Sequence, residues 1–169
     1  MCSSDLHFSM CGKFAAPSSW QQVTAFEDPL TVTVPAFDEQ DKLTVYRVMT
    51  ALPVVVSDAR ASKRVVVPMR WGFPDARNPR VPRPIHARGE TIDATPAFAA
   101  AFKQGQGGTV LAKTFNEGRE LKNGKTEQHT ITPGPLGAVG LAFVWRRFSS
   151  PALPAPMFAC VMVTVGPMH

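Results

Sequence analysis

A cysteine stands directly after a methionine near the start of the chain, where residues 10–14 have the sequence Met-Cys-Gly-Lys-Phe. If translation begins at Met10 and this methionine is removed, Cys11 carries a free α-amine and a thiol on adjacent carbons. The amine condenses with an aldehyde to an imine, and the sulfur then closes a five-membered thiazolidine ring. An interior cysteine lacks the free amine, so this chemistry requires a processed amino terminus.

A basic stretch follows an aromatic motif in the middle of the chain. Residues 70–74 have the sequence Arg-Trp-Gly-Phe-Pro, and residues 76–89 contain four arginines and no acidic residue. Arginines contact phosphates while aromatic faces stack on bases, so this combination favours single-stranded nucleic acid. The alternative is a solvated basic loop above a tryptophan that is only packed in the core.

Two further residues could move protons. His86 begins the segment His-Ala-Arg-Gly-Glu-Thr, next to the basic stretch, and Glu117 precedes a glycine at the end of an expected strand. A carboxylate in such a place acts either as a general base at a cleft or as a turn residue. His86 is either the edge of a site or a structural hydrogen-bonding group. The residues alone leave both alternatives open.

Composition limits the class of protein. A chain of 169 residues with 44% hydrophobic content suits one globular domain, and a net charge of +5 favours an anionic partner. The cysteines at positions 2, 11 and 160 lack Cys-x-x-Cys spacing, which argues against a disulfide framework or a zinc site. We therefore predict a cytoplasmic, nucleoid-associated monomer without metal or cofactor.

No membrane segment is expected. Residues 1–9 lack the basic and apolar regions of a secretory signal. An uncharged stretch, residues 149–168, contains four prolines, which break the continuous helix that a membrane span requires. Its end, Met157–Val165, is predicted to be a buried strand.

The elements that must position these residues are mostly strands. Two short helices are expected, over residues 18–26 and over Thr95–Phe102, the second with Thr95 as N-cap and Pro96 at its first position. An extended proline-rich loop covers residues 73–84, and turns cover 104–108 and 122–125. The expected strands are Leu30–Val34, Leu43–Val48, Pro53–Ser57, Arg64–Pro68, Thr109–Phe115, Gln128–Thr132, Ala138–Trp145 and Met157–Val165. Since no βαβ alternation is visible, we predict an α+β fold around a largely antiparallel, barrel-like sheet.

Taken in order, the motifs resemble those of the SRAP family, the SOS-response-associated peptidases or abasic-site-processing proteins. That family opens with Met-Cys-Gly-Arg-Phe, which residues 10–14 match, and continues with an Arg-Trp-Gly-aliphatic-Pro loop, which residues 70–74 match. Its Asn-Ala-Arg-x-Glu-Thr motif and following Pro-Ala-Phe helix resemble residues 86–91 and 96–98. Its Gly-Phe-Tyr-Glu-Trp segment resembles residues 114–118, and the resemblance runs from Met10 to about Val165.

The resemblance implies a DNA damage response protein that crosslinks the ring-opened aldehyde of an abasic site in single-stranded DNA. Cys11 would be the nucleophile, Glu117 the proton-handling carboxylate, and His86 would stand at the place of the family asparagine. An α-amine titrates near pH 8, so a neighbouring carboxylate that accepts its proton would help it attack. Phosphate contacts would come from Lys13, Arg70 and Arg88, and base contacts from Trp71 and Phe73.

The chain departs from the family pattern at its two ends as well as at His86. We expect residues 1–9 to be a leader outside a single domain of residues 10–169, because a retained leader turns the Cys11 nitrogen into an amide. At the other end, His169 stands where the family continues with His-x-Arg-Met-Pro. Two alternatives therefore stay open: a non-covalent single-stranded-DNA-binding module, and a Cys-dependent peptidase in which Cys11 acts with Glu117 or His86.

Overall fold

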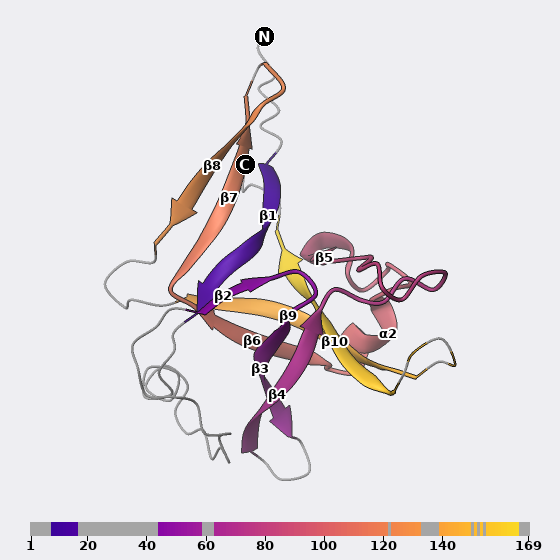
Figure 1. Ribbon diagram of the computed structural model, residues 1–169. Coiled ribbons are helices and arrows are strands. Elements are labelled where there is room, and N and C mark those ends of the chain that lie inside the picture. The colour runs from indigo at the N-terminus through magenta and orange to yellow at the C-terminus, as the bar shows by residue number, and fades with distance from the viewer. Residues whose placement is uncertain are drawn as a thin grey trace.

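The computed structural model describes residues 8–16, 44–58, 63–121, 123–132, 139–149, 151, 153 and 155–165. Within these ranges the chain forms two sheets and very few helical turns (Figure 1). The strands are β1 (Phe8–Ala16), β2 (Thr44–Arg47), β3 (Ala51–Asp58), β4 (Lys63–Trp71), β5 (His86–Arg88), β6 (Gly107–Ala112), β7 (Thr114–Glu120), β8 (Thr126–Ile131), β9 (Val139–Phe148) and β10 (Met157–Thr164). The helical elements are the 3-10 turn η1 (Gly89–Thr91) and the helix α2 (Ala99–Lys103).

The six-stranded sheet has the order β4-β3-β6-β9-β10-β5, and β4 also pairs with β10. Hydrogen bonding therefore runs from β4 through four other strands and back to β4, so that this sheet is partly closed into a ring. The four-stranded sheet has the order β2-β1-β7-β8 and is antiparallel throughout. The predicted class of mostly antiparallel strands with few short helices is confirmed, although the strands are divided between two sheets.

Valine-rich sequences explain the pairing of β3 with β4. Val54 lies opposite Val67 and Val55 opposite Val66, and branched side chains of this kind pack well on a pleated surface. Gly108 of β6 then lets β3 approach closely. A Cβ at that position would lie 2.5 Å from Val54 Cγ1, closer than packed atoms allow.

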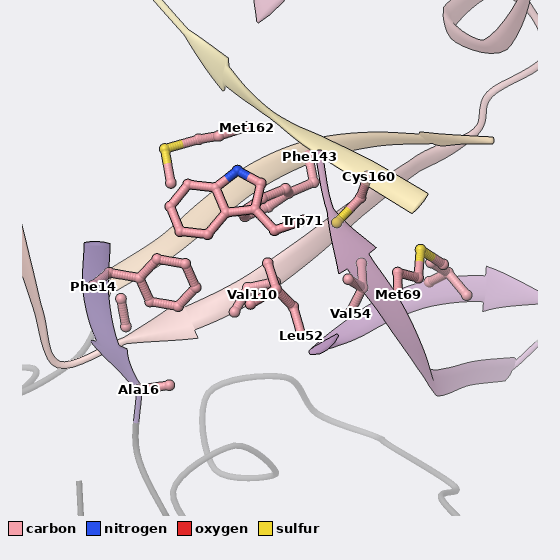
Figure 2. Packing of buried hydrophobic residues seen from close by; sticks show 12 residues of the cluster. Phe14, Ala16, Leu52, Val54, Met69, Trp71, Val110, Phe143, Cys160 and Met162 are labelled. Carbon is pink, nitrogen blue, oxygen red and sulfur yellow. The ribbon is translucent and has the colours of Figure 1, made fainter. Parts of the chain in front are cut away.

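The buried residues of the described part of the chain form two large clusters and a small third one, Val55 with Leu111. The first cluster surrounds Trp71, whose ring centroid lies 5.2 Å from that of Phe14 and 6.2 Å from that of Phe143 (Figure 2). Its buried members are Phe14, Ala16, Leu52, Val54, Val56, Met69, Trp71, Val110, Ala112, Phe143, Cys160 and Met162. The second cluster lies beneath the η1 and α2 segment and contains Phe73, Ala87, Ile92, Phe98, Ala101, Val144, Ala159 and Val161. Phe14 belongs to β1, so the first cluster joins the two sheets.

Some predicted boundaries are wrong. The strand expected over Thr109–Phe115 is broken at Lys113, whose backbone N–H donates to Ala15 O at 2.8 Å, and its halves become β6 and β7 in different sheets. The turn expected over residues 104–108 ends early, since β6 begins at Gly107. The helix expected from Thr95 begins at Ala99, because the Thr95 hydroxyl donates back to Thr91 O and does not cap the helix.

Other sequence predictions agree with the structure. The segment Met157–Val165 forms β10, and the turn near residues 122–125 joins β7 to β8, with Gly124 at a φ of +74°. The helix expected over residues 18–26 and the strand expected over Leu30–Val34 lie outside the described residues. No helix in the described part of the chain is long and apolar enough to cross a membrane.

Candidate functional site

The strand that carries Cys11 lies beside the strand that carries Glu117. In the pairing of β1 with β7, Met10 is opposite Glu117 and Phe14 is opposite Phe115. The register shifts between these two pairs, since β1 advances by four residues while β7 advances by two. This bulge contains Cys11, and bulges of this kind often occur beside active sites, where they redirect a side chain. Figure 1 shows β1 running along β7 at the centre of the four-stranded sheet.

β1 begins before the expected start of the domain. Phe8 pairs with Arg119 and Ser9 with Gly118, so two residues of the predicted leader 1–9 belong to a strand of the fold. In this form of the chain the Cys11 nitrogen is a peptide amide within β1, which cannot condense with an aldehyde.

Glu117 lies at the edge of the first cluster. Alternate residues of a strand share a face, so Glu117 is on the face of β7 that also carries Phe115, which packs against that cluster. Desolvation by burial raises the pKa of the Glu117 carboxyl above its ordinary value. A carboxyl with a raised pKa retains and releases a proton nearer to neutral pH, which suits a general base.

β8 brings a histidine to Glu117. His129 is directly opposite Glu117 in the β7–β8 register, and its Nε2 lies 3.2 Å from Glu127 Oε2. Sequence analysis missed His129. The signal that could have identified it is the turn at Asn123-Gly124, because a tight hairpin turn fixes which residues of its two strands face each other.

Trp71 and Phe73 are core residues. The side chain of Trp71 is 0% exposed and that of Phe73 is 2% exposed. Trp71 Nε1 donates to Ile85 O at 3.2 Å, and the Phe73 ring packs against the rings of Phe98 and Phe148. Arg70 and Trp71 also lie in β4 and not on the predicted loop. Neither ring has an open face in this structure, and their contact with bases stays a prediction.

Arg70 holds the loop that follows β4. Its Nε donates to Gly72 O at 3.2 Å and its Nη1 donates to Pro79 O at 2.9 Å. Burial lowers the pKa of the guanidinium from its ordinary value. The remaining nitrogen, Nη2, is buried and has no hydrogen-bond partner among the described residues. Arg70 is therefore first a structural residue, with one donor left for a ligand.

His86 is a second residue that contacts Trp71. It belongs to β5, pairs with Met162 of β10, and meets the Trp71 ring edge-on at a centroid distance of 6.4 Å. Burial lowers the pKa of its imidazole, so the ring is neutral at pH 7. Its Nε2 is buried and finds no hydrogen-bond partner within the described ranges.

Three exposed cations lie on β1, β2 and β5. Lys13 of β1 lies directly opposite Arg47 of β2, and Arg88 is exposed at the end of β5. Like charges on directly opposed residues repel each other, and a bound anion relieves this repulsion. Sequence analysis predicted Lys13 and Arg88 and missed Arg47, because the register between β1 and β2 is not visible in the sequence.

Cys160 is not a second nucleophile. It is buried in the first cluster, and desolvation raises the pKa of its thiol to about 12. A thiol with this pKa carries almost no thiolate at neutral pH, and the thiolate is the reactive form. Among the described residues, no group of three or more His, Cys, Asp or Glu side chains could hold a metal ion.

Comparison with known proteins identifies the family. A family model described as SOS response associated peptidase (SRAP) matches residues 10–169. Among solved structures, a protein from Bordetella bronchiseptica is 16% identical, with a TM-score of 0.69 over 93% of this chain and 73% of that chain. A protein from Bacteroides thetaiotaomicron is 13% identical, with a TM-score of 0.70 over 92% of this chain and 68% of that chain. These two share the fold, whereas no curated protein matches the chain. The chain belongs to the SOS response associated peptidase family, and this membership supports a role related to DNA damage.

Proposed function

We propose that the chain, once Cys11 is its amino terminus, captures the aldehyde of an abasic site in single-stranded DNA as a thiazolidine. The observation that carries this proposal is the pairing of β1 with β7, in which the bulge containing Cys11 lies next to Glu117. The net charge of +5 and the exposed cations Lys13, Arg47 and Arg88 support an anionic partner.

The chemistry needs one base and no oxidant. Glu117 accepts a proton from the α-ammonium of Cys11, and the freed amine attacks the aldehyde carbon to give a carbinolamine. The carbinolamine hydroxyl takes up a proton and leaves as water, which forms the imine. The Cys11 thiolate then attacks the imine carbon, the imine nitrogen is protonated, and the ring closes. The aldehyde oxygen leaves as the single water molecule released.

The DNA contacts that we propose differ in part from those that the sequence predicts. Lys13, Arg47 and Arg88 contact phosphates, while Arg70 fixes the loop after β4 and offers only its Nη2. His86, which is neutral at pH 7, orients the deoxyribose through a hydrogen bond. Trp71 and Phe73 support this surface from the core and are not assigned to bases.

A second candidate function is non-covalent binding of single-stranded DNA. The observation that favours it is the start of β1 at Phe8, because residues before Cys11 are then part of the sheet and the Cys11 nitrogen stays an amide. The two functions use the same exposed cations, Lys13, Arg47 and Arg88. They differ in whether the amine of Cys11 is free.

The test compares two chain lengths on the same DNA. A chain that begins at Met10, with the methionine removed, should form a denaturation-resistant adduct with single-stranded DNA that contains an abasic site. The Cys11→Ser variant should form no stable adduct, because serine lacks the sulfur that closes the ring. The full chain, confirmed as uncleaved by mass spectrometry, should bind without an adduct.

Glu117 is tested on the same substrate. Glu117→Gln keeps the size of the side chain and removes the base, so adduct formation should slow by about 10²–10⁴-fold while DNA affinity stays constant. Higher pH should partly restore the rate, because the α-amine then loses its proton unaided. An equally stable adduct from Cys11→Ser, or a wild-type rate from Glu117→Gln at pH 7, would contradict the proposed chemistry.

A further inference from the structure

β8 is exposed along its whole length, yet it carries an ordered pair of titratable groups. His129 Nε2 and Glu127 Oε2 are 3.2 Å apart, and their side chains are 46% and 52% exposed. The packing of an apolar core does not hold this pair, because no buried residue lies on β8. Its position is set by the register with β7, which places His129 opposite Glu117.

The register puts three groups in a row across two strands. Directly opposed residues of an antiparallel pair lie on the same face, with Cβ atoms about 4.5–5.5 Å apart. Glu117 and His129 therefore share a face, and Glu127 lies two residues along β8 on that same face. The row runs from an exposed carboxylate through an exposed imidazole to a half-buried carboxyl.

The strand register also gives the other residues next to Glu117. On β1 the opposed residue is Met10, which does not titrate, and the adjoining bulge holds Cys11 and Lys13. On β7 itself, Arg119 follows two residues later, in register with Glu127. His129 is the titratable residue that the β7–β8 register places directly opposite Glu117.

We propose that His129 is a positioning residue that keeps Glu117 ionised, so that Glu117 is able to accept the proton of the Cys11 amine. This inference rests on the proposed function. Desolvation alone favours the protonated form of Glu117, which cannot act as a base. A cation opposite Glu117 favours the carboxylate, and Glu127 Oε2, 3.2 Å from His129 Nε2, restrains the ring.

The pH range of the effect follows from the two groups. A positive charge on His129, directly opposite Glu117, favours the ionised form of the Glu117 carboxyl. The imidazolium therefore lowers the pH at which Glu117 gains its proton. Opposite charges on directly opposed residues near a protein surface interact strongly enough to move a pKa by about half a unit to one unit.

The first experiment measures Glu117 without any reaction. The Glu117 carboxyl carbon is titrated by NMR in the full chain, with Glu117→Gln used to assign its signal. His129→Gln should raise the pKa of Glu117 by about half a unit to one unit. His129→Lys should keep the wild-type value because it keeps a cation, and Glu127→Gln should give a smaller rise. Thr130→Gln is the matched control, since Thr130 is equally exposed but lies on the other face of β8.

The second experiment measures the rate of adduct formation against pH, with chains that begin at Met10. The acidic limb of the profile should move up by the same amount in His129→Gln and return to its wild-type position in His129→Lys. A Glu117 pKa that is unchanged in His129→Gln, or a shift that His129→Lys does not reverse, would overturn the inference. If no chain forms an adduct, the proposed function fails, and the NMR titration still decides whether His129 controls the charge of Glu117.

Discussion

In the six-stranded sheet and its following loop the conspicuous aromatic residues are buried, whereas in the four-stranded sheet a whole strand is exposed. Trp71 and Phe73 have 0% and 2% of their side chains exposed, and Arg70 is bonded to two backbone carbonyls. Every residue of β8 is exposed, and β7 beside it carries the half-buried Glu117. The motif that most resembles a nucleic-acid-binding loop is therefore a structural element, and the candidate chemistry lies on the other sheet.

The two regions are not independent, because Phe14 joins them. Phe14 lies on β1 three residues after Cys11, and its ring contacts the Trp71 ring in the first cluster (Figure 2). The position of the bulge therefore depends on packing in the six-stranded sheet. Loss of Trp71 should displace β1 and thereby the bulge that contains Cys11. Substitutions on β8 should change the surroundings of Glu117 and leave the core unchanged.

Replacing Trp71 with alanine should have the largest effect on stability. Removal of a fully buried tryptophan costs about 3–5 kcal/mol, and it also leaves Ile85 O without its donor. Thermal denaturation should show Tm falling by roughly 6–20 °C in a chain of this length. The Tm of Trp71→Phe should fall by less than that of Trp71→Ala. An unchanged Tm, together with weaker DNA binding, would instead assign Trp71 to base stacking and reverse the comparison between the two sheets.

Replacing Arg70 and replacing Arg88 should have different effects, the first on stability and the second on DNA affinity. Arg88→Gln should flatten the log–log salt dependence of single-strand affinity by about 0.7, the value for one phosphate contact, and should leave Tm unchanged. Arg70→Gln should lower Tm, because hydrogen bonds from a charged donor contribute about 1.5–3 kcal/mol. Salt titrations of DNA binding and thermal melts measure the two effects. A normal Tm for Arg70→Gln would show that its two carbonyl contacts do not hold the loop.

His86 should make the stability of the fold depend on pH, with an effect of intermediate size. Burial lowers the pKa of His86 in the folded chain below its ordinary value of 6.5, so the unfolded chain binds the proton more readily. Stability from the neutral ring is therefore present above pH 6.5 and is lost as the pH falls through the folded-state pKa. His86→Asn should remove this acid sensitivity in urea denaturation at pH 5 and pH 8. Equal pH dependence in both proteins would show that the imidazole is freely solvated.

The same contrast explains which features could be predicted from the sequence. The runs of valine and threonine predicted β3, β4 and β10, because branched residues with period-two patterning favour strands. The burial of Trp71 could not be predicted, since an arginine-rich context fits both a DNA-binding loop and a strand whose aromatic residue points into the core. The break at Lys113 and the pairing of Glu117 with His129 depend on which strands become neighbours. That choice is made by tertiary packing.

The smallest expected effect is the change in stability of Glu117→Gln. It distinguishes a chemical role of Glu117 from a structural one. Burial raises the pKa of Glu117 above its ordinary value of 4.5, so folding favours the neutral carboxyl. The resulting stability is present below pH 4.5 and is lost as the pH rises through the folded-state pKa. At pH 7 the ionised Glu117 therefore opposes folding slightly, and glutamine removes this opposition.

Thermal melts at pH 7 should show Tm rising by less than about 2 °C in Glu117→Gln, because solvent screens a half-exposed charge. At pH 4 the difference between the two proteins should shrink, and Asn116→Ser, on the other face of β7, serves as the matched control. Trp71→Ala and Glu117→Gln would then both reduce adduct formation while changing stability in opposite directions. A residue that is retained for its chemistry need not stabilise the fold. A fall in Tm for Glu117→Gln at pH 7 would therefore show that Glu117, like Trp71, has a structural role.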